Sequence, residues 1–568
     1  MRMRFGRDLA LALEVEVERW TNIDGVRRLW AKDAALWTNS DESSWMGWLD
    51  LVPMPSPRLV LAELIEQVAA SGVRDVLLVG MGGSSLAPEV VTQVLPPRSD
   101  SPTLHVLDST DPAQIRRVLG ECDLSRTLCI TSSKSGGTLE TSLLTDYVLE
   151  RLRERVGSNA VGERCLAITD SGSALELLAR RLKFSAILHG ASSVGGRFSA
   201  LSHFGLVPPL LCGRDVETLV DRATKMALRC GSGAAPAQNP GVRLGLALGT
   251  AALMGRDKAT LILSPAIASL GRWLEQLVAE STGKAGRGLL PVVGEEVGSP
   301  ASYGTDRLFV YLRLAEELDP EQEASAERLA DAGLPVIDLT LSDRFDLGSE
   351  FFRWEVATAV CASVLGVHPF DQPDVEAGKR TTGDLAVAYE SSGVWPEKAS
   401  IAVEVGLEAY ADPETAAALR RSAGPEAGMQ ELLLTHLERL GPGDYFAVLA
   451  YLEQSPECQG LLHQMRTGVR QGRGVATILG FGPGFLHSTG QVFKGGRDNG
   501  VFLQITCDDE ADMQIPGKGY TFGGIKRAQA DGDLQVLANR GRRVLGVHLG
   551  VDMRSGLELL TRMVLAAA

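Results

Sequence analysis

Short runs of apolar residues alternate with longer helical patterns along most of the chain. The first region contains five such runs, at 73–80, 103–108, 127–132, 165–170 and 184–189. A second set follows at 260–263, 289–293, 308–311 and 336–341. Runs that are apolar throughout and are separated by helices predict parallel sheets covered on both faces. The predicted fold class is α/β, with two domains in which a parallel sheet lies between layers of helices. The similar pattern of the two regions is what one fold used twice would produce.

The rest of the chain departs from this pattern. Residues 1–54 are helical in pattern and rich in Trp, which predicts an arm packed on the main body. The two α/β domains are assigned to 55–215 and 216–397. Residues 398–568 open with helical patterns and become rich in glycine from Gly472 onward, so they are predicted to form an α+β C-terminal region.

Composition narrows the class of protein. The 568 residues include 56 Lys and Arg against 71 Asp and Glu, a formal charge of −15. An acidic chain is a poor candidate for binding nucleic acid or an anionic membrane. The eight cysteines are scattered without a C-x-x-C pair, which is typical of reduced thiols in the cytoplasm. Neither a signal peptide nor a membrane span is predicted, because no apolar run approaches the roughly 18 residues required.

Two strand ends carry candidate phosphate-binding chemistry, since ligands of open parallel sheets bind beyond the carboxyl ends of the strands. The first strand runs into Gly82-Gly83-Ser84, and the third into Ser133-Lys134-Ser135-Gly136-Gly137-Thr138-Leu139-Glu140-Thr141. Glycines let the backbone approach an anion, and hydroxyls at a helix start can bind a phosphate. A tight turn with ordinary helix capping is the alternative interpretation. The order of residues is not that of a Walker loop.

Further motifs extend this pattern into a family resemblance. The two segments above resemble sugar isomerase (SIS) domains, which bind phosphosugars. Segments 193–199 (SVGGRFS) and 370–379 (FDQPDVEAGK) match two signatures of the phosphoglucose isomerase family, and 280–284 (ESTGK) resembles its E-S-x-G-K motif. The resemblance implies reversible conversion of glucose 6-phosphate to fructose 6-phosphate through an enediol(ate), with neither a metal nor a cofactor.

The resemblance also implies roles for single residues. Glu280 is the predicted base that moves a proton between C2 and C1, a task that suits a carboxylate within reach of both carbons. Arg197 would stabilise charge on the enediolate oxygens, and Lys379 would assist ring opening. The predicted phosphate ligands are Ser84, Ser133, Ser135, Thr138 and Thr141, with Lys134 acting chiefly through its backbone N–H. The predicted substrate loop comprises Gly82, Gly83, Gly196 and Gln372.

The ring-opening histidine departs from the family pattern. Between Glu280 and Lys379 the only histidine is His368, whereas 486–491 (LHSTGQ) resembles the segment around the catalytic histidine of many bacterial members. We therefore predict that this segment has been relocated and that His487 is the histidine. Asp306, His368 or Lys379 alone are the alternatives for ring opening, and His203 is a candidate pocket residue.

Several expectations about the whole protein follow from the resemblance. The ESTGK and FDQPDVE motifs and the extended segment 480–491 (GFGP…LHSTGQ) together resemble the isomerase half of bifunctional transaldolase–phosphoglucose isomerase fusions, a resemblance that spans nearly the whole chain. Transaldolase activity is not predicted, because no (β/α)₈ barrel pattern precedes Gly80. Many relatives form dimers, so a homodimer is expected, and a relocated histidine could act in its own or the partner subunit. Two other functions stay open: an isomerase that also accepts mannose 6-phosphate, and a non-catalytic phosphosugar sensor.

Overall fold

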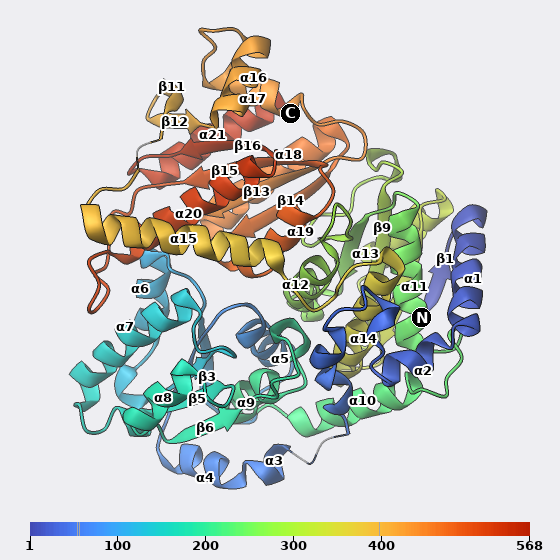
Figure 1. Ribbon diagram of the computed structural model, residues 1–568, viewed down its shortest axis with the longest axis vertical. Coiled ribbons are helices and arrows are strands. Elements are labelled where there is room, and N and C mark those ends of the chain that lie inside the picture. Colours follow the sequence, from blue (N-terminus) through green and yellow to red (C-terminus); the bar gives the residue numbers. More distant parts are fainter. Residues whose placement is uncertain (54, 56, 397) are drawn as a thin grey trace.

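The computed structural model describes residues 1–53, 55, 57–396 and 398–568. The strands within these residues form three sheets, each at the centre of an α/β unit (Figure 1). The domain boundaries placed at 54 and 397 fall on residues outside this description. All nine apolar runs predicted as strands coincide with strands of the first two sheets.

The first unit is built on five parallel strands in the order β3-β2-β4-β5-β6. Their bounds are β2 (Asp75–Gly80), β3 (Thr103–Leu107), β4 (Thr127–Ser132), β5 (Cys165–Thr169) and β6 (Ala186–His189). The surrounding helices are α3 (Pro57–Val60), α4 (Ala62–Ala70), α5 (Leu86–Val94), α6 (Pro112–Glu121), α7 (Leu139–Val156), α8 (Ala174–Arg181) and α9 (His203–Leu211). Strand β4 is buried along its whole length, as expected for a strand covered on both faces.

The second unit has the strand order β1-β10-β9-β7-β8. Its strands are β7 (Lys258–Leu263), β8 (Leu290–Val292), β9 (Arg307–Leu314), β10 (Val336–Leu341) and β1 (Arg2–Arg4), and the last of these pairs antiparallel with β10. Its helices are α10 (Val216–Arg229), α11 (Pro240–Leu253), α12 (Leu270–Thr282), α13 (Pro320–Asp331) and α14 (Leu347–Leu365).

The third unit opens with strands where helical patterns were predicted. The hairpin of β11 (Ser400–Glu404) and β12 (Leu407–Tyr410) leads into the order β11-β12-β16-β15-β13-β14. The other strands are β13 (Tyr445–Tyr451), β14 (Ala476–Phe481), β15 (Gly500–Thr506) and β16 (Arg543–His548). The helices are α16 (Pro413–Ala423), α17 (Met429–Leu437), α18 (Pro456–Arg473), α19 (Gly490–Gly495), α20 (Phe522–Asn539) and α21 (Met553–Ala567). The antiparallel pairs lie at one edge, beside a core of four parallel strands.

All three sheets share one core order. Each sheet has a core of four parallel strands, counted here in chain order without β1, β6, β11 and β12. The first core strand pairs with the second on one side and with the third on the other, and the fourth core strand pairs with the third. The cores are β3-β2-β4-β5, β8-β7-β9-β10 and β14-β13-β15-β16, and all their pairs are parallel. The repetition expected for the first two regions therefore extends to the third. Each unit has its switch point between its first and third strands, where ligands of such sheets bind.

The N-terminal arm packs on the second unit through α1 (Arg7–Asn22) and α2 (Gly25–Trp30), as Figure 1 shows. Trp20 and Trp48 of this arm are fully buried. The Trp48 ring lies 5.2 Å from that of Phe198, centroid to centroid, and so supports the turn that carries Arg197.

Helix α15 (Pro373–Ser392) crosses from the second unit to the third and packs on α19 and α20 (Figure 1). Because α15 carries Lys379, this packing places the lysine motif beside the segment that carries His487. No helix among the described residues is long and apolar enough to cross a lipid bilayer.

Candidate active site

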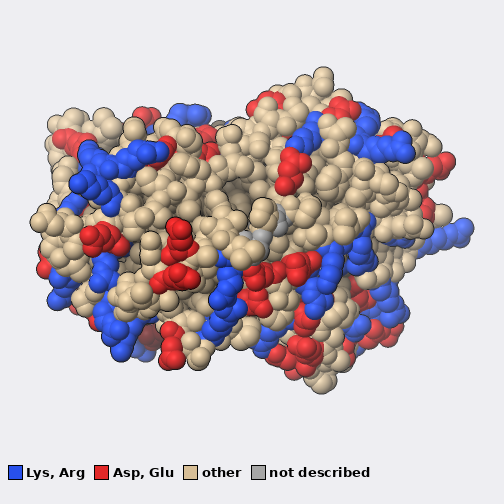
Figure 2. All heavy atoms as spheres, turned by 90° about the horizontal axis from the view of Figure 1, so that it is seen from below, with Lys and Arg blue, Asp and Glu red and all other residues tan. Residues whose placement is uncertain are grey.

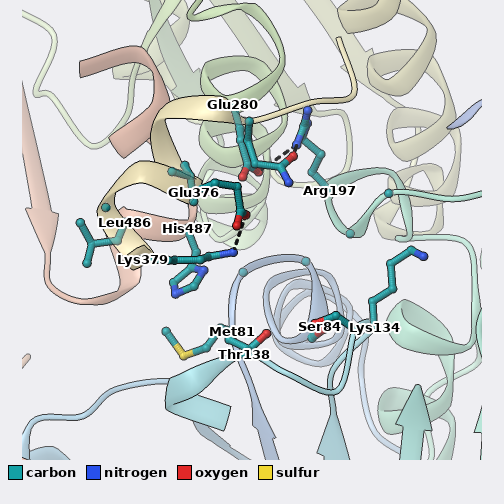
Figure 3. Close-up of a pocket in the computed structure, with 18 of the residues that line it drawn as sticks. Met81, Ser84, Lys134, Thr138, Arg197, Glu280, Glu376, Lys379, Leu486 and His487 are labelled. Atoms are coloured by element: carbon teal, nitrogen blue, oxygen red, sulfur yellow. Dashed lines mark hydrogen bonds and ion pairs between the residues drawn. The ribbon is translucent and has the colours of Figure 1, made fainter. Parts of the chain in front are cut away.

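A cavity of about 900 Å³ lies between the three units and takes side chains from each of them. The first unit contributes the ends of β2 and β4, the second contributes α12 and α15, and the third contributes η11 (Gly484–His487), α19 and α20. Figure 3 shows residues of the predicted cradle on one side of the cavity and Glu280, Lys379 and His487 on the other. Most of the predicted site residues therefore face one another, although they come from segments that are far apart in sequence.

The turn after β2 packs closely on its neighbours because it lacks side chains at two positions. A Cβ on Gly83 would lie 2.1 Å from the backbone oxygen of Gly196, so this turn and the Arg197 turn meet backbone to backbone. Gly82 has a φ of +54°, and a Cβ there would lie 2.7 Å from Gln276 Nε2. Ser84 lines the cavity beside them. The predicted loop glycines thus bring the first and second units together.

The segment after β4 presents hydroxyls at the start of α7. Ser135 and Thr138 line the cavity, and the Thr138 hydroxyl lies 3.4 Å from that of Ser133. Ser133 and Thr141 are buried behind the cavity surface. The Lys134 ammonium turns to Asp170 and to the Ser192 carbonyl. Its side chain therefore already has partners, which agrees with a phosphate contact through its backbone.

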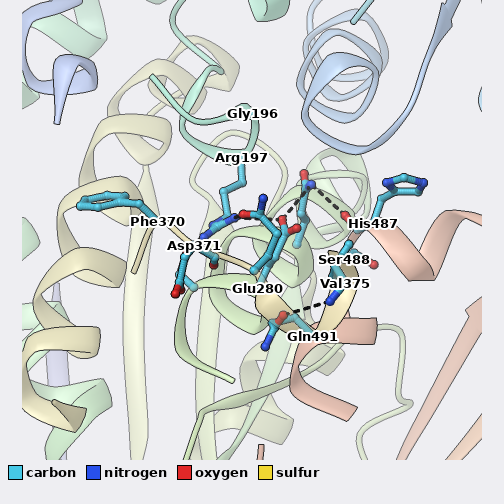
Figure 4. Close-up of polar contacts among 12 residues, drawn as sticks. Gly196, Arg197, Glu280, Phe370, Asp371, Val375, His487, Ser488 and Gln491 are labelled. Carbon is cyan, nitrogen blue, oxygen red and sulfur yellow. Dashed lines mark hydrogen bonds and ion pairs between the residues drawn. The ribbon is translucent and has the colours of Figure 1, made fainter. Parts of the chain in front are cut away.

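Glu280 and Arg197 form a buried pair on the opposite wall, with 3.4 Å between Glu280 Oε2 and Arg197 Nη1 (Figure 4). The guanidinium also donates to Ser281 Oγ at 2.8 Å and to Gln372 Oε1 at 3.0 Å, and its Nη2 donates to two backbone carbonyls. Burial lowers the pKa of Arg197, and the Glu280 carboxylate opposes that shift. The side chain is fixed in place with positive charge beside the carboxylate.

His487 reaches the same cavity from the third unit. Its Nε2 donates to Glu140 Oε1 at 3.0 Å, which leaves Nδ1 as the nitrogen that can exchange a proton. Burial, the largest single influence, would raise the pKa of Glu140, but the charge and hydrogen bond of His487, the Glu140 backbone and Lys379 together outweigh it and lower the pKa to about 2. The carboxylate thus stays ionised beside the imidazole at neutral pH. Gln276 Nε2 donates to the His487 carbonyl at 2.8 Å and lies 3.3 Å from Glu280 Oε2, so it joins the two groups.

Lys379 lies on the cavity side of α15, where its ammonium pairs with Glu376 at 2.9 Å. The Lys379 side chain is 42% exposed, in contrast to the buried Arg197. Lys379 is therefore the most accessible of the predicted catalytic groups.

Gln491, the last residue of the LHSTGQ segment, holds three parts of the site together (Figure 4). Its Nε2 donates to the Gly283 carbonyl at 2.9 Å, just beyond the helix that carries Glu280, and to Asp374 Oδ2 at 2.7 Å. Its Oε1 accepts from the backbone N–H of Asp374 at 3.0 Å, at the start of the Lys379 helix. The position of His487 is thus coupled to those of Glu280 and Lys379.

Two of the three alternatives for ring opening, His368 and Asp306, lie outside the cavity, as does the candidate pocket residue His203. His368 Nε2 pairs with Asp41 at 2.9 Å, and its Nδ1 accepts from the backbone N–H groups of Phe370 and Asp371. Asp306 pairs with the buried Lys258 at 3.3 Å, and His203 contacts the His189 carbonyl at 2.9 Å. Among the residues that the structure describes, none of these three side chains lines the cavity.

Sequence reasoning missed several groups that line the cavity, among them Glu140, Gln276, Gln529 and the ion pair of Lys494 with Asp533. Gln276 precedes Glu280 by four residues on a helix, a spacing that places both on one face and could have revealed it. Glu140 lies inside the predicted cradle, but its contact with His487 is 347 residues distant in sequence. The Lys494–Asp533 pair has no comparable local signal.

Hydroxyls at a strand end that face a carboxylate, a fixed guanidinium and an imidazole are the arrangement expected of a phosphosugar isomerase of the SIS fold. Residues 63–289 match the family model described as phosphoglucose isomerase, a stretch that includes the cradle, Arg197 and Glu280. A glucose-6-phosphate isomerase of Rubrobacter xylanophilus is 31% identical over 367 residues, which cover 56% of this chain and 84% of that protein. One from Synechococcus sp. (strain JA-3-3Ab) is 28% identical over 450 residues, covering 66% and 83%. The chain belongs to the phosphoglucose isomerase family.

Solved structures agree on the fold. A hypothetical protein of Thermus thermophilus superposes with a TM-score of 0.58 at 26% identity and covers 67% of this chain and 99% of its own. A glucose-6-phosphate isomerase of Chlamydia trachomatis gives a TM-score of 0.51 at 20% identity, covering 65% and 78%.

Proposed function

We propose that this chain interconverts glucose 6-phosphate and fructose 6-phosphate at the cavity between its three units. The observation that carries the proposal is the Glu280–Arg197 pair, buried at 3.4 Å, in a cavity that also opens onto the hydroxyls of Ser84, Ser135 and Thr138. The family membership supports the same reaction.

In this proposal the substrate phosphate is held at the ends of β2 and β4. The hydroxyl groups of Ser84, Ser135 and Thr138 donate hydrogen bonds to the phosphate oxygens. The backbone N–H groups near Lys134 donate further hydrogen bonds. Ser133 and Thr141 lie behind this surface and support it. Binding the phosphate fixes one end of the sugar, so that the reacting carbons reach the opposite wall.

Ring opening is the task proposed for His487 and Lys379. His487 Nδ1 takes the proton of the anomeric hydroxyl and delivers a proton to the ring oxygen as the C1–O5 bond breaks. Glu140 keeps the imidazole in the required tautomer and stabilises its protonated form. Lys379, exposed on the cavity side of α15, adds positive charge near the leaving oxygen.

Glu280 then carries the isomerisation. Its carboxylate removes the C2 proton of the open aldose, and the electron pair moves through an enediolate. Arg197 stabilises the negative charge that develops on the oxygens, and it needs no rearrangement because its contacts hold it in place. Glu280 returns the proton at C1, while a proton moves between the two oxygens, giving the ketose.

The cellular setting is proposed more coarsely. All eight cysteines are free thiols and six of them are buried, which supports a reducing, cytoplasmic location. Acidic and basic side chains are interspersed over the face seen in Figure 2, as expected for a protein that acts on a small molecule. A homodimer stays a prediction from the family. No observation favours mannose 6-phosphate as an additional substrate, and the buried Glu280–Arg197 pair argues against a sensor that only binds.

A coupled assay of fructose 6-phosphate conversion tests the proposal. Glu280→Gln is expected to lower kcat by about 10²–10⁴-fold, the usual contribution of a positioned base. His487→Ala should lower turnover of the cyclic sugar more than that of the open-chain form. A wild-type protein that binds the sugar phosphate without converting it would leave only the sensor.

A further inference from the structure

One face of α20 carries three buried polar side chains whose partners lie outside that helix. Lys526, Gln529 and Asp533 are 3%, 1% and 2% exposed. Their spacing of three and four residues places them on a single face of the helix. Lys526 Nζ pairs with Asp111 of the first unit at 2.9 Å, and Asp533 pairs with Lys494 of α19 at 2.5 Å. The third unit thus contacts the first unit through Lys526, whereas the Asp533–Lys494 pair joins two helices of the third unit itself.

Gln529 lies between these two ion pairs and contacts the Glu140–His487 pair directly. Its Nε2 donates to Glu140 Oε1 at 2.7 Å, the same oxygen that accepts from His487 Nε2 at 3.0 Å. Its Oε1 accepts from the Thr110 hydroxyl at 2.6 Å. An ionised carboxylate only accepts hydrogen bonds, so the amide nitrogen must face Glu140 and the amide oxygen must face Thr110.

Two donors that converge on one carboxylate oxygen restrict its rotation more than one donor does. In a buried site a charged group with a missing hydrogen bond is strongly disfavoured, and such networks also set the direction of their members. Without Gln529, the Glu140 carboxylate could turn away from the imidazole.

We propose that Gln529 is a positioning residue that aims the Glu140 carboxylate at His487. The proposal extends the network of the proposed ring-opening histidine through Glu140 and Gln529 to Thr110, and it rests on that proposed function. It gives the third unit a second contribution to the site besides the histidine itself.

Other charges near the pair come from every side of it. Lys379 on α15 favours the ionised form of Glu140. Burial raises the pKa of Asp108, which follows β3, and the charge of His487 opposes that shift. Lys494 and Asp533 line the same cavity. These groups stay in place in the variants below, so that a change in the NMR resonances of His487 can be assigned to position 529.

The first test compares two buried glutamines of the third unit. Gln529→Leu should lower kcat about tenfold while KM changes less than twofold, because a hydrogen bond to a charged group is lost without loss of a substrate contact. Gln504 is a matched control, since it is also fully buried and its amide donates to the Ala530 carbonyl of α20 at 2.9 Å. Gln504→Leu should leave kcat within twofold of wild type.

The second test uses the imidazole itself. The histidine NMR resonance that is missing from His487→Ala identifies His487. In Gln529→Glu a second buried carboxyl lies beside Glu140, and the two share one proton because carboxyls in contact do not both ionise. The hydrogen bond that Glu140 offers to the imidazole then changes, so the NMR resonances of His487 should shift in Gln529→Glu and should stay in place in Gln504→Glu.

These results separate the inference from the function on which it rests. A Gln529→Leu enzyme with the kcat of Gln504→Leu, together with unchanged His487 resonances in Gln529→Glu, overturns the positioning role. If His487→Ala keeps wild-type activity, the ring-opening role fails instead, and the NMR resonances still report the contact. Should the Gln529 variants not fold, Thr110→Val removes only the donor that orients the amide and should lower kcat about threefold, whereas wild-type kcat would contradict the proposal.

Discussion

In the first unit, helix α7 follows β4, and its N-cap residue Thr138 makes no side-chain cap hydrogen bond within the described residues. In the third unit, the corresponding helix α20 follows β15, and the hydroxyl of its N-cap residue Thr521 accepts from the Gly524 N–H at 3.0 Å. There the Gly523 N–H also donates to Asp512 at 2.7 Å. The two units share their core strand order, yet one leaves this helix start open to an anion and the other fills it with its own carboxylate.

The difference shows that the fold alone does not make a phosphate site. A helix start attracts an anion through N–H groups that have no partner in the protein. In the first unit a short segment, 133–138, places hydroxyls there, whereas in the third unit the segment 507–521 folds back over the helix. The third unit contributes to the cavity from other elements, through His487 after β14 and Gln529 on α20.

The largest predicted effect concerns which chain supplies the histidine. Because His487 lies in the cavity of its own chain, 3.0 Å from Glu140, the first and third units of one chain should complete one site. Glu280→Gln and His487→Ala should each lose activity by about 10²–10⁴-fold, and co-expressing the two variants should recover none of it. Recovery toward about a quarter of wild-type activity in the coupled assay, the share expected for a randomly assembled dimer, would mean that the third unit serves a partner subunit.

A smaller effect should follow from giving the first unit the feature that fills the third. Thr138→Asp places a carboxylate at the start of α7, where it would replace a hydroxyl donor and repel the substrate phosphate. We expect kcat/KM for fructose 6-phosphate to fall by about 100-fold, mostly through KM.

Ser142→Asp is the matched control for that variant, because Ser142 lies one turn farther along α7 and is exposed. It adds the same charge to the same helix and should leave kcat/KM within about twofold. Equal losses in the two variants would show that net charge, rather than the open helix start, governs binding.

The smallest effect is expected from the reverse change in the third unit. Asp512→Ala removes the acceptor of the Gly523 N–H and should destabilise the protein by about 1 kcal/mol, a typical value for a lost cap. The midpoint of thermal unfolding should fall by about 1 °C, because the unfolding entropy of so long a chain is large, with isomerase activity unchanged. A loss of activity greater than twofold would mean that this helix start takes part in catalysis.

Much of the fold could be predicted from local pattern, and the exceptions have physical reasons. Nine of the ten strands described in the first two units, all except β1, are apolar runs bounded by turns, a strong signal. The runs at β13 and β14 are similar, but short apolar segments do not by themselves distinguish buried helix from buried strand. The hairpin β11–β12 was missed because its residues alternate over only four or five positions.

The site could be predicted where a motif is continuous in sequence, as for Glu280, Arg197 and the 133–138 segment. The contacts that join residues of different units within the site could not be predicted. Glu140 meets His487, and Gln529 meets Glu140, only because three sheets pack around one cavity. Contacts at such sequence separation depend on tertiary packing, which no local pattern encodes.

The central claim is that Glu280 moves a proton between adjacent carbons of the sugar. Conversion of fructose 6-phosphate in D₂O, followed by proton NMR, tests it most directly, because a carboxyl that holds the proton can exchange it with solvent. We predict deuterium at C2 of the glucose 6-phosphate formed by the wild-type protein, and no detectable product from Glu280→Gln at the same enzyme concentration. Undiminished conversion by Glu280→Gln would contradict the claim, because another group would then have to move the proton.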